Sequence, residues 1–168
     1  MDSTDGMVVG WKQPSHPGLI YVPRLPGRGS SAISLVSLPP GGLFAKITSS
    51  TPCERPTWTS VQYHRDGSSF ELNSDLVLCN HSCRPSLVFD TSKFEVRVAD
   101  NRPVKAGDAL TFFYPSTEWD MHEPFTCECS GHCGTRIAGA KHASATLLKQ
   151  VWLNEHIKDL LAARGSGS

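Results

Sequence analysis

Glycine and proline interrupt this chain so often that long regular elements are excluded. The sequence holds 14 glycines and 12 prolines among 168 residues, and both residue types punctuate helices and strands. Pro-Pro-Gly-Gly at 39–42 and Asp66-Gly67 are typical of turns between strands. A chain of this length is expected to build one hydrophobic core. The sequence therefore predicts one domain of short strands joined by loops and turns.

Short apolar runs between these turns are the candidate strands. Two hairpins are expected, one pairing 57–63 with 69–72 around Asp66-Gly67, the other pairing 87–90 with 94–99. In the second hairpin Phe94, Val96 and Val98 alternate with other residues, which predicts one buried face. Further strands are expected at 18–25, 32–38, 43–47 and 110–114.

Helices are expected only near the C-terminus. Ser144 can cap a turn that carries Leu147 and Leu148, and Asn154 can cap a second helix in which Ile157 and Leu161 share a face. We expect these apolar faces to pack on the core rather than on a partner. The predicted fold class is mainly β with short helices (α+β).

The charge balance argues against the partners that strongly charged proteins bind. Sixteen basic and sixteen acidic residues cancel, so no direct nucleic-acid binding and no membrane association are expected. No apolar run reaches the roughly 18 residues of a membrane span, and Met1–Asp5 lacks the features of a signal peptide. We expect an intracellular protein of the cytoplasm or nucleus, whose six cysteines are thiols or metal ligands rather than disulfides.

Three motifs follow one another in the second half of the chain. They are Asn-His-Ser-Cys-Arg-Pro-Ser at 80–86, Gly-Asp-Ala-Leu-Thr-Phe-Phe-Tyr at 107–114, and Cys127-x-Cys129-x-x-x-Cys133. In this order and spacing they resemble the C-terminal half of a SET domain followed by a post-SET segment. The family pattern is N-H-S-C-x-P-N, then G-E-E-L-T-x-x-Y, then C-x-C-x4-C. The resemblance extends from Gly29 to Lys141 and implies a β-clip fold of short sheets with a knot-like C-terminal segment.

The resemblance also implies a division of the chain. The expected parts are a flexible N-terminal arm at 1–17, a compact SET domain at 18–122, a post-SET cysteine segment at 123–141, a helical tail at 142–164, and a linker or tag scar at 165–168. Fewer than forty residues separate the turn at Gly41 from Asn80. The resemblance is therefore to a minimal, stand-alone SET domain, without the cysteine-rich block or long insert of many histone-directed relatives.

Members of the SET family use S-adenosylmethionine, and the motifs imply which residues would hold it. Asn80 and His81 would line its pocket, and backbone groups at Gly29 would contact its methionine end. Tyr114 takes the position of the catalytic tyrosine, whose hydroxyl would orient the transferred methyl group. A phenol pKa near 10 argues against a role as general base. The alternatives are an ordinary loop for 80–81 and a tyrosine packed in the core.

Three aromatic residues are candidates for a wall of the same pocket. Phe125 is expected to contact the cofactor, while Tyr63 and Trp119 are weaker candidates for contact with the substrate amine. Core packing is an equal alternative for each of them.

The cysteine motif resembles the zinc site of the post-SET segment. Cys83 would join Cys127, Cys129 and Cys133 as a set of four thiolate ligands for one zinc ion. The last gap is one residue shorter than in the family pattern. The alternative is a group of reduced, partly buried thiols, and His132 is a weaker candidate ligand.

The function that the resemblance implies is an S-adenosylmethionine-dependent N-methyltransferase acting on lysine or another primary amine. The chain departs from the family pattern at Ser86 and Phe113, where many members carry Asn and Asp. Two alternatives therefore stay open. One is a repurposed enzyme of small-molecule metabolism, with or without methyl transfer, and the other is a non-catalytic binding module. The sequence does not indicate the oligomeric state.

Overall fold

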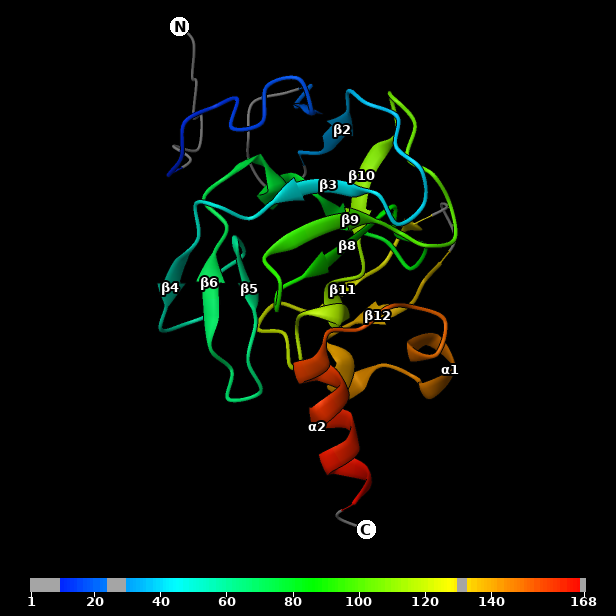
Figure 1. Ribbon diagram of the computed structural model, residues 1–168. Coiled ribbons are helices and arrows are strands. Elements are labelled where there is room, and N and C mark those ends of the chain that lie inside the picture. The colour runs from blue at the N-terminus through cyan, green and yellow to red at the C-terminus, as the bar shows by residue number, and fades with distance from the viewer. Residues whose placement is uncertain (1–9, 24–29, 130–132, 167–168) are drawn as a thin grey trace, which may run out of the picture.

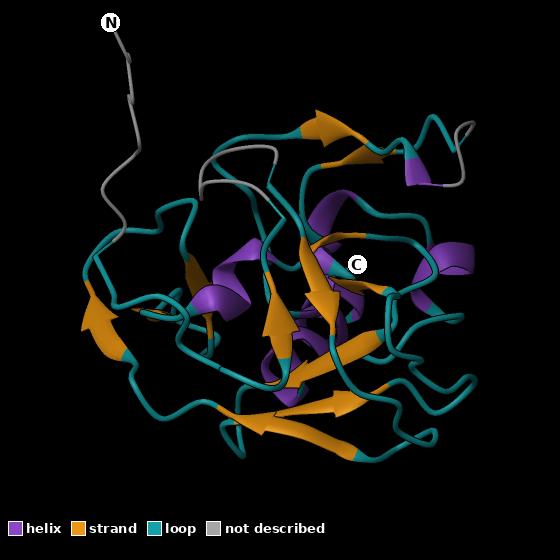
Figure 2. Cartoon of the chain, turned by 90° about the horizontal axis from the view of Figure 1, so that it is seen from above, coloured by secondary structure: helices purple, strands orange, loops and turns teal. Residues whose placement is uncertain are grey.

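The protein is mainly β with short helices, as expected from its sequence (Figure 1). The computed structural model describes residues 10–23, 30–129 and 133–166. Within them the strands form one four-stranded, two three-stranded and one two-stranded sheet. The C-terminal helices lie together at the end of the molecule that carries the C-terminus (Figure 1). Seen from above, the C-terminus falls near the middle of the view, and strands lie on several sides of it (Figure 2). Among the described residues, no helix combines the length and apolarity needed to cross a membrane.

The four-stranded sheet joins the two halves of the chain. Its order is β1 (Ile20–Tyr21), β2 (Ala32–Ser34), β10 (Ala109–Phe112) and β7 (Asn80–His81). Strand β10 is antiparallel to β2 but parallel to β7, with Thr111 opposite Asn80 and Phe112 opposite His81. The first two motifs found in the sequence therefore lie side by side.

The two three-stranded sheets contain the expected hairpins. Their orders are β3 (Leu43–Lys46), β9 (Glu95–Val98), β8 (Leu87–Asp90), and β4 (Thr51–Cys53), β6 (Ser69–Glu71), β5 (Ser60–Gln62). Gly67 turns between β5 and β6 with φ of 92°, a backbone angle that favours glycine. The remaining pair is β11 (Phe125–Thr126) with β12 (Arg136–Ile137).

One predicted core position is wrong. Val96 and Val98 are fully buried, but Phe94 is 38% exposed. Phe94 precedes strand β9 and has a φ of 52°, so it belongs to the turn and not to the alternating pattern. Its ring stacks on Phe70 at 5.1 Å between centroids.

Residues 11–15, which fall in the expected N-terminal arm, are bound to Asp75. The Trp11 indole, the Gln13 amide and the Ser15 backbone N–H all donate to its carboxylate, at 2.7–2.9 Å. Asp75 begins the 3-10 helix η1 (Asp75–Leu78) and is buried. Burial raises the pKa of Asp75, but these hydrogen bonds outweigh it, so that the pKa lies below its usual value.

The C-terminal helices begin where the sequence predicts. The 3-10 helix η4 (Ala140–His142) precedes α1 (Ala145–Leu148), where Ser144 accepts a hydrogen bond from Leu147 N–H, as a cap should. Helix α2 (Glu155–Gly165) begins after Asn154, but the Asn154 side chain makes no capping bond. A second core cluster of Phe113, Ala140, Leu153 and Ile157 packs this region on the domain.

The Asn154 side chain instead joins three segments of the domain. Its amide nitrogen donates to the carbonyls of Phe89 and Ser116, each at 2.8 Å. Its oxygen accepts from the backbone N–H and hydroxyl of Thr91 at 3.0 and 3.2 Å. Asn154 is 1% exposed, so none of these groups would find water if the amide were lost.

Asn154→Asp should therefore destabilise the fold by about 2 kcal/mol or more, because it replaces two buried donors with a carboxylate that faces two carbonyl oxygens. Urea unfolding would measure the difference. The exposed Asn101→Asp makes the same chemical change and should shift the unfolding midpoint little. Equal midpoints for the two variants would contradict the role assigned to Asn154.

Candidate active site and metal centre

A cavity of about 460 Å³ lies between β5, η1, the end of β10 and the segment that leads to β11. Its volume falls in the range of small-molecule sites. The wall combines apolar side chains from β10 and η1 with hydroxyl and amide groups from residues 57–62. Trp58 and Phe125 contribute aromatic rings to the wall from two separate segments.

Three of the residues expected to bind cofactor line this one cavity, namely Asn80, Tyr114 and Phe125. They come from β7, from the 3-10 helix η2 (Tyr114–Ser116) and from β11. The Asn80 amide donates to the carbonyl of Ser30 at 3.0 Å, which places the start of β2 at the same cavity. Gly29 lies outside the described residues.

The Tyr114 hydroxyl is oriented by a hydrogen bond to the backbone. It donates to the carbonyl of Cys79 at 3.1 Å, so its oxygen keeps lone pairs for accepting further contacts. Burial, with a smaller effect of nearby Cys79 and Glu118, raises the pKa of Tyr114 well above its usual value. Tyr114 is therefore a neutral phenol at physiological pH and is unsuited to remove a proton from a substrate.

His81 lies behind the cavity wall and supports it. Its ring packs against Phe113, Tyr114 and Phe125 at 5.4–5.6 Å between centroids. Its Nδ1 accepts a hydrogen bond from the Tyr114 backbone N–H at 3.1 Å. Burial lowers the pKa of His81 to about 4, so the ring is neutral at pH 7 and carries its proton on Nε2.

The two weaker substrate candidates lie elsewhere. Tyr63 is 36% exposed and packs on Phe70 at 5.4 Å between centroids. Trp119 packs with the C-terminal core cluster. Neither residue is among those that line the cavity.

Glu118 lines the cavity but lies outside the sequence motifs. Its backbone N–H donates to the carbonyl of Tyr114 at 3.0 Å, so one helical turn separates the two residues. This four-residue spacing was the available signal, because residues four apart on a helical turn lie on the same side. One Glu118 carboxylate oxygen, Oε2, accepts from the Gln62 backbone N–H at 2.9 Å. Burial raises the pKa of Glu118 to about 7, against the effect of this bond and of Thr117.

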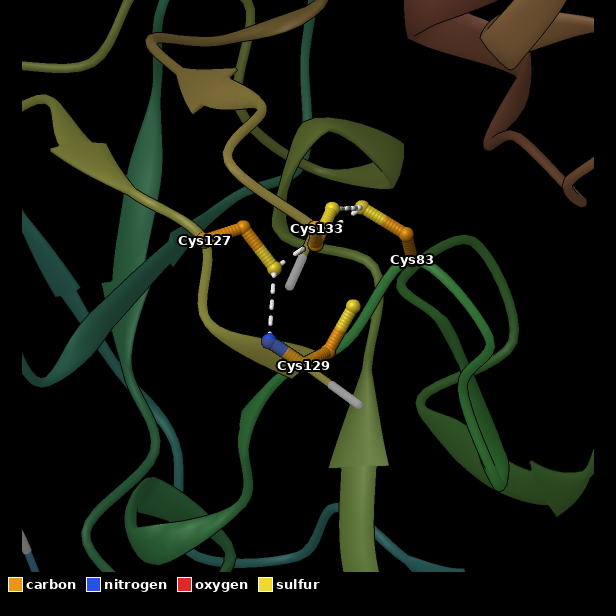
Figure 3. A group of neighbouring side chains, drawn as sticks. All are labelled: Cys83, Cys127, Cys129 and Cys133. Atoms are coloured by element: carbon orange, nitrogen blue, oxygen red, sulfur yellow. Dashed lines mark hydrogen bonds between the residues drawn. The ribbon is translucent and has the colours of Figure 1, made fainter. Parts of the chain in front are cut away.

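The four expected metal ligands are brought together on one side of the cavity wall. The sulfur atoms of Cys83, Cys127, Cys129 and Cys133 all lie within 4.8 Å of one another, and the side chains converge on a common centre (Figure 3). Cys83 Sγ is 3.9 Å from Cys127 Sγ and 3.7 Å from Cys133 Sγ. The Cys129 backbone N–H also donates to Cys127 Sγ at 3.3 Å. The shortened spacing of the motif thus still allows four thiols to meet.

The cluster has the chemistry of a cation site. Burial raises the pKa of Cys83 and of Cys127, whereas contact with Thr135 lowers the pKa of Cys133 to about 6. A central cation would favour the thiolate form of every member. The His81 Nε2 lies 3.5 Å from Cys83 Sγ, so its N–H points to a sulfur of the cluster, an arrangement that resembles the outer hydrogen bonds of metal sites. The cluster could bind a metal ion.

The fold and the site together define a small β-rich protein with a cavity of about 460 Å³ beside a four-cysteine cluster. No family model matches the chain. Over 156 residues it is 55% identical to a protein of Aspergillus flavus named methyltransferase flvH, and the match covers 92% of this chain and 87% of that protein. The chain belongs to the same family as this methyltransferase.

Purified protein should contain about one tightly bound thiophilic metal ion per chain, because four sulfur ligands at these distances form a closed site. Cys83→Ser should lower the metal content markedly, as measured by elemental analysis. Cys53→Ser is the matched control, since Cys53 lies outside the cluster, and should leave the content unchanged. Metal-free protein with four freely titrating thiols in the cluster would contradict this assignment.

Proposed function

We propose that this protein is an S-adenosylmethionine-dependent N-methyltransferase with a minimal SET-like domain, acting on lysine or another amine. One observation carries the proposal. Asn80 and Tyr114 belong to two separate sequence motifs, Phe125 lies two residues before the third, and all three line one cavity. The name of the Aspergillus flavus relative supports methyl transfer, and the divisions 18–122 and 123–141 are the SET-like and post-SET parts in this proposal.

The walls of the cavity suit S-adenosylmethionine, which supplies an electrophilic methyl group on a positively charged sulfur. Phe125 offers a ring for stacking against adenine, and the polar edge near Asn80 and Ser30 suits the methionine end. No lysine or arginine is among the described residues that line the cavity, whereas Glu118, Asp120 and Glu123 are. This charge pattern favours positively charged ligands. Gly29 stays a proposed backbone contact.

Tyr114 is proposed to align the methyl group. Its proton is held by the Cys79 carbonyl, so the phenolic oxygen presents acceptor lone pairs to a polarised methyl group through weak C–H···O contacts. Methyl transfer between sulfur and nitrogen requires the reacting atoms to be in line, and alignment of this kind accounts for much of the rate. His81 supports Tyr114 by accepting its backbone N–H.

The metal proposed for the cysteine cluster is zinc. Tetrahedral zinc with Zn–S distances of about 2.3 Å requires sulfur atoms about 3.8 Å apart, close to the 3.9 and 3.7 Å found from Cys83 to Cys127 and Cys133. Cys127 lies two residues after Phe125. A zinc ion would therefore fix the segment that places Phe125 on the cavity.

The proposal is tested by methyl transfer from methyl-labelled S-adenosylmethionine to lysine peptides, free amino acids and simple alkylamines. Labelling of an amine nitrogen, identified by mass spectrometry, is the expected result. Binding of S-adenosylmethionine without transfer to any member of the panel or to a cell extract would instead favour a repurposed or non-catalytic SET-like protein.

Tyr114→Phe should lower the transfer rate by about 10²–10³-fold, since it removes the oriented hydroxyl but keeps the ring. Affinity for S-adenosylhomocysteine should change little. Tyr21→Phe is the matched control, because Tyr21 is 53% exposed on β1 and does not line the cavity. A Tyr114→Phe rate within a few-fold of the wild-type rate would reduce Tyr114 to a packing residue.

A further inference from the structure

Three carboxylates line the cavity, and they differ in their surroundings. Asp120 pairs with Lys141 at 3.1 Å and with His142 at 2.8 Å. Glu123 is exposed to solvent, where its charge is screened. Glu118 is less exposed, and within the described part of the chain no lysine, arginine or histidine forms an ion pair with it. Glu118 is thus the least exposed of the three carboxylates, and no cation of the described residues pairs with it.

Glu118 is held in place by its backbone and by Gln62. The Gln62 backbone N–H binds the Glu118 carboxylate, and the Gln62 side-chain oxygen accepts from the backbone N–H of Trp119 at 3.1 Å. From the other side, the Glu118 carbonyl accepts from Ala140 N–H at 2.9 Å, and His156 Nε2 contacts the Thr117 carbonyl at 2.8 Å. A carboxylate that is fixed this firmly beside Tyr114 is pre-organised for a ligand.

Amine methylation needs a group with these properties. An alkylamine with a pKa of about 10 is an ammonium ion at neutral pH, and an ammonium nitrogen has no lone pair with which to attack a methyl group. One proton must therefore leave before or during transfer. Tyr114 is a neutral phenol whose proton is already donated to Cys79, so the cavity needs a different acceptor.

We propose that the Glu118 carboxylate binds the ammonium group of the substrate and accepts one of its protons, so that the freed nitrogen lone pair can attack the methyl group. This proposal rests on the proposed function and names the residue that selects a cationic amine. The proton moves from nitrogen to Glu118. The N–C bond then forms as the C–S bond breaks, and the bond's electron pair stays on sulfur. The protonated carboxyl returns its proton to solvent when the product leaves.

The environment of Glu118 suits this role. A base works best when its pKa lies near the working pH, and burial raises the pKa of Glu118 to about 7. The titratable groups that face it are Tyr114 from η2 and Cys53 from β4. The groups that share its cavity wall are Asp120, His122 and Glu123 from the loop that follows. Burial thus disfavours the anionic form of Glu118 more than the hydrogen bonds from Gln62 and Thr117 favour it, and an arriving ammonium ion would stabilise that form.

Binding can be tested without knowing the natural substrate, with n-butylammonium chloride as the probe and n-butanol as its neutral counterpart. The probe is titrated into the protein with and without S-adenosylhomocysteine. Wild-type protein should prefer n-butylammonium to n-butanol, and Glu118→Gln should weaken n-butylammonium binding at least tenfold. The wild-type affinity should also fall as the pH drops below about 7, where Glu118 gains a proton. Glu155→Gln, which changes an exposed carboxylate on α2, should leave the affinity unchanged.

Two further measurements separate this role from a structural one. In methyl transfer, Glu118→Gln should lower kcat/KM roughly 10²-fold or more and remove the rise of kcat/KM toward pH 7, while its affinity for S-adenosylhomocysteine stays at the wild-type value. The variant should also unfold at a higher temperature than wild type above pH 7. The pKa of Glu118 is higher in the folded state than its ordinary 4.5, so folding stability declines as pH rises from about 4.5 to 7, and glutamine removes that loss.

Equal n-butylammonium affinity in wild type and Glu118→Gln would overturn the inference. Loss of S-adenosylhomocysteine binding in the variant would also overturn it, because the carboxylate would then belong to the cofactor site. A lower melting temperature above pH 7 would make Glu118 a structural residue. If the wild-type protein methylates no amine, the proposed function is contradicted. If the wild-type protein methylates amines and Glu118→Gln does so equally well, this inference alone is contradicted.

Discussion

The parallel pairing of β7 with β10 is the constraint on which the site depends. It is only two residues long in each strand, with Asn80 opposite Thr111 and His81 opposite Phe112. Further bonds extend it at both ends, from Ser82 N–H to the Phe112 carbonyl at 3.0 Å and from the Tyr114 hydroxyl to the Cys79 carbonyl. Parallel neighbours need a long connection between them, and here that connection carries the β8–β9 hairpin of the adjacent sheet. This short pairing therefore fixes the relative positions of two segments that lie about thirty residues apart in the sequence.

This pairing serves the cavity and the cysteine cluster at once. Asn80 lines the cavity, His81 supports Tyr114 from behind, and Cys83 joins the cluster three residues further on. The neutral His81 ring lies between the two sites, accepting from Tyr114 on one nitrogen and facing Cys83 sulfur with the other. Metal loading and cavity geometry are therefore expected to be coupled, since both act on one short strand.

The sequence predicted the features that rest on local chemistry. Turn residues placed the two hairpins, Ser144 and Asn154 marked both helix starts, and motif spacing identified the four cysteines that meet. Features set by tertiary packing were missed. Phe94 fits the alternating pattern but lies in a turn, and Asn154 satisfies distant carbonyls instead of its own helix. Glu118 could not be identified from the sequence, because its importance comes from its burial beside Tyr114 and not from its residue type. The two-residue strands β7, β11 and β12 are too short for hydrophobic periodicity to detect.

The central claim is that one cavity, walled by Asn80, Tyr114 and Phe125, binds S-adenosylmethionine. Calorimetric titration of metal-loaded protein with S-adenosylmethionine and with S-adenosylhomocysteine tests it most directly, because binding does not require the acceptor to be known. We expect saturable binding of both compounds at one site per chain, in the micromolar range, and weaker binding after the metal is removed. Absence of binding by metal-loaded, folded protein would contradict it.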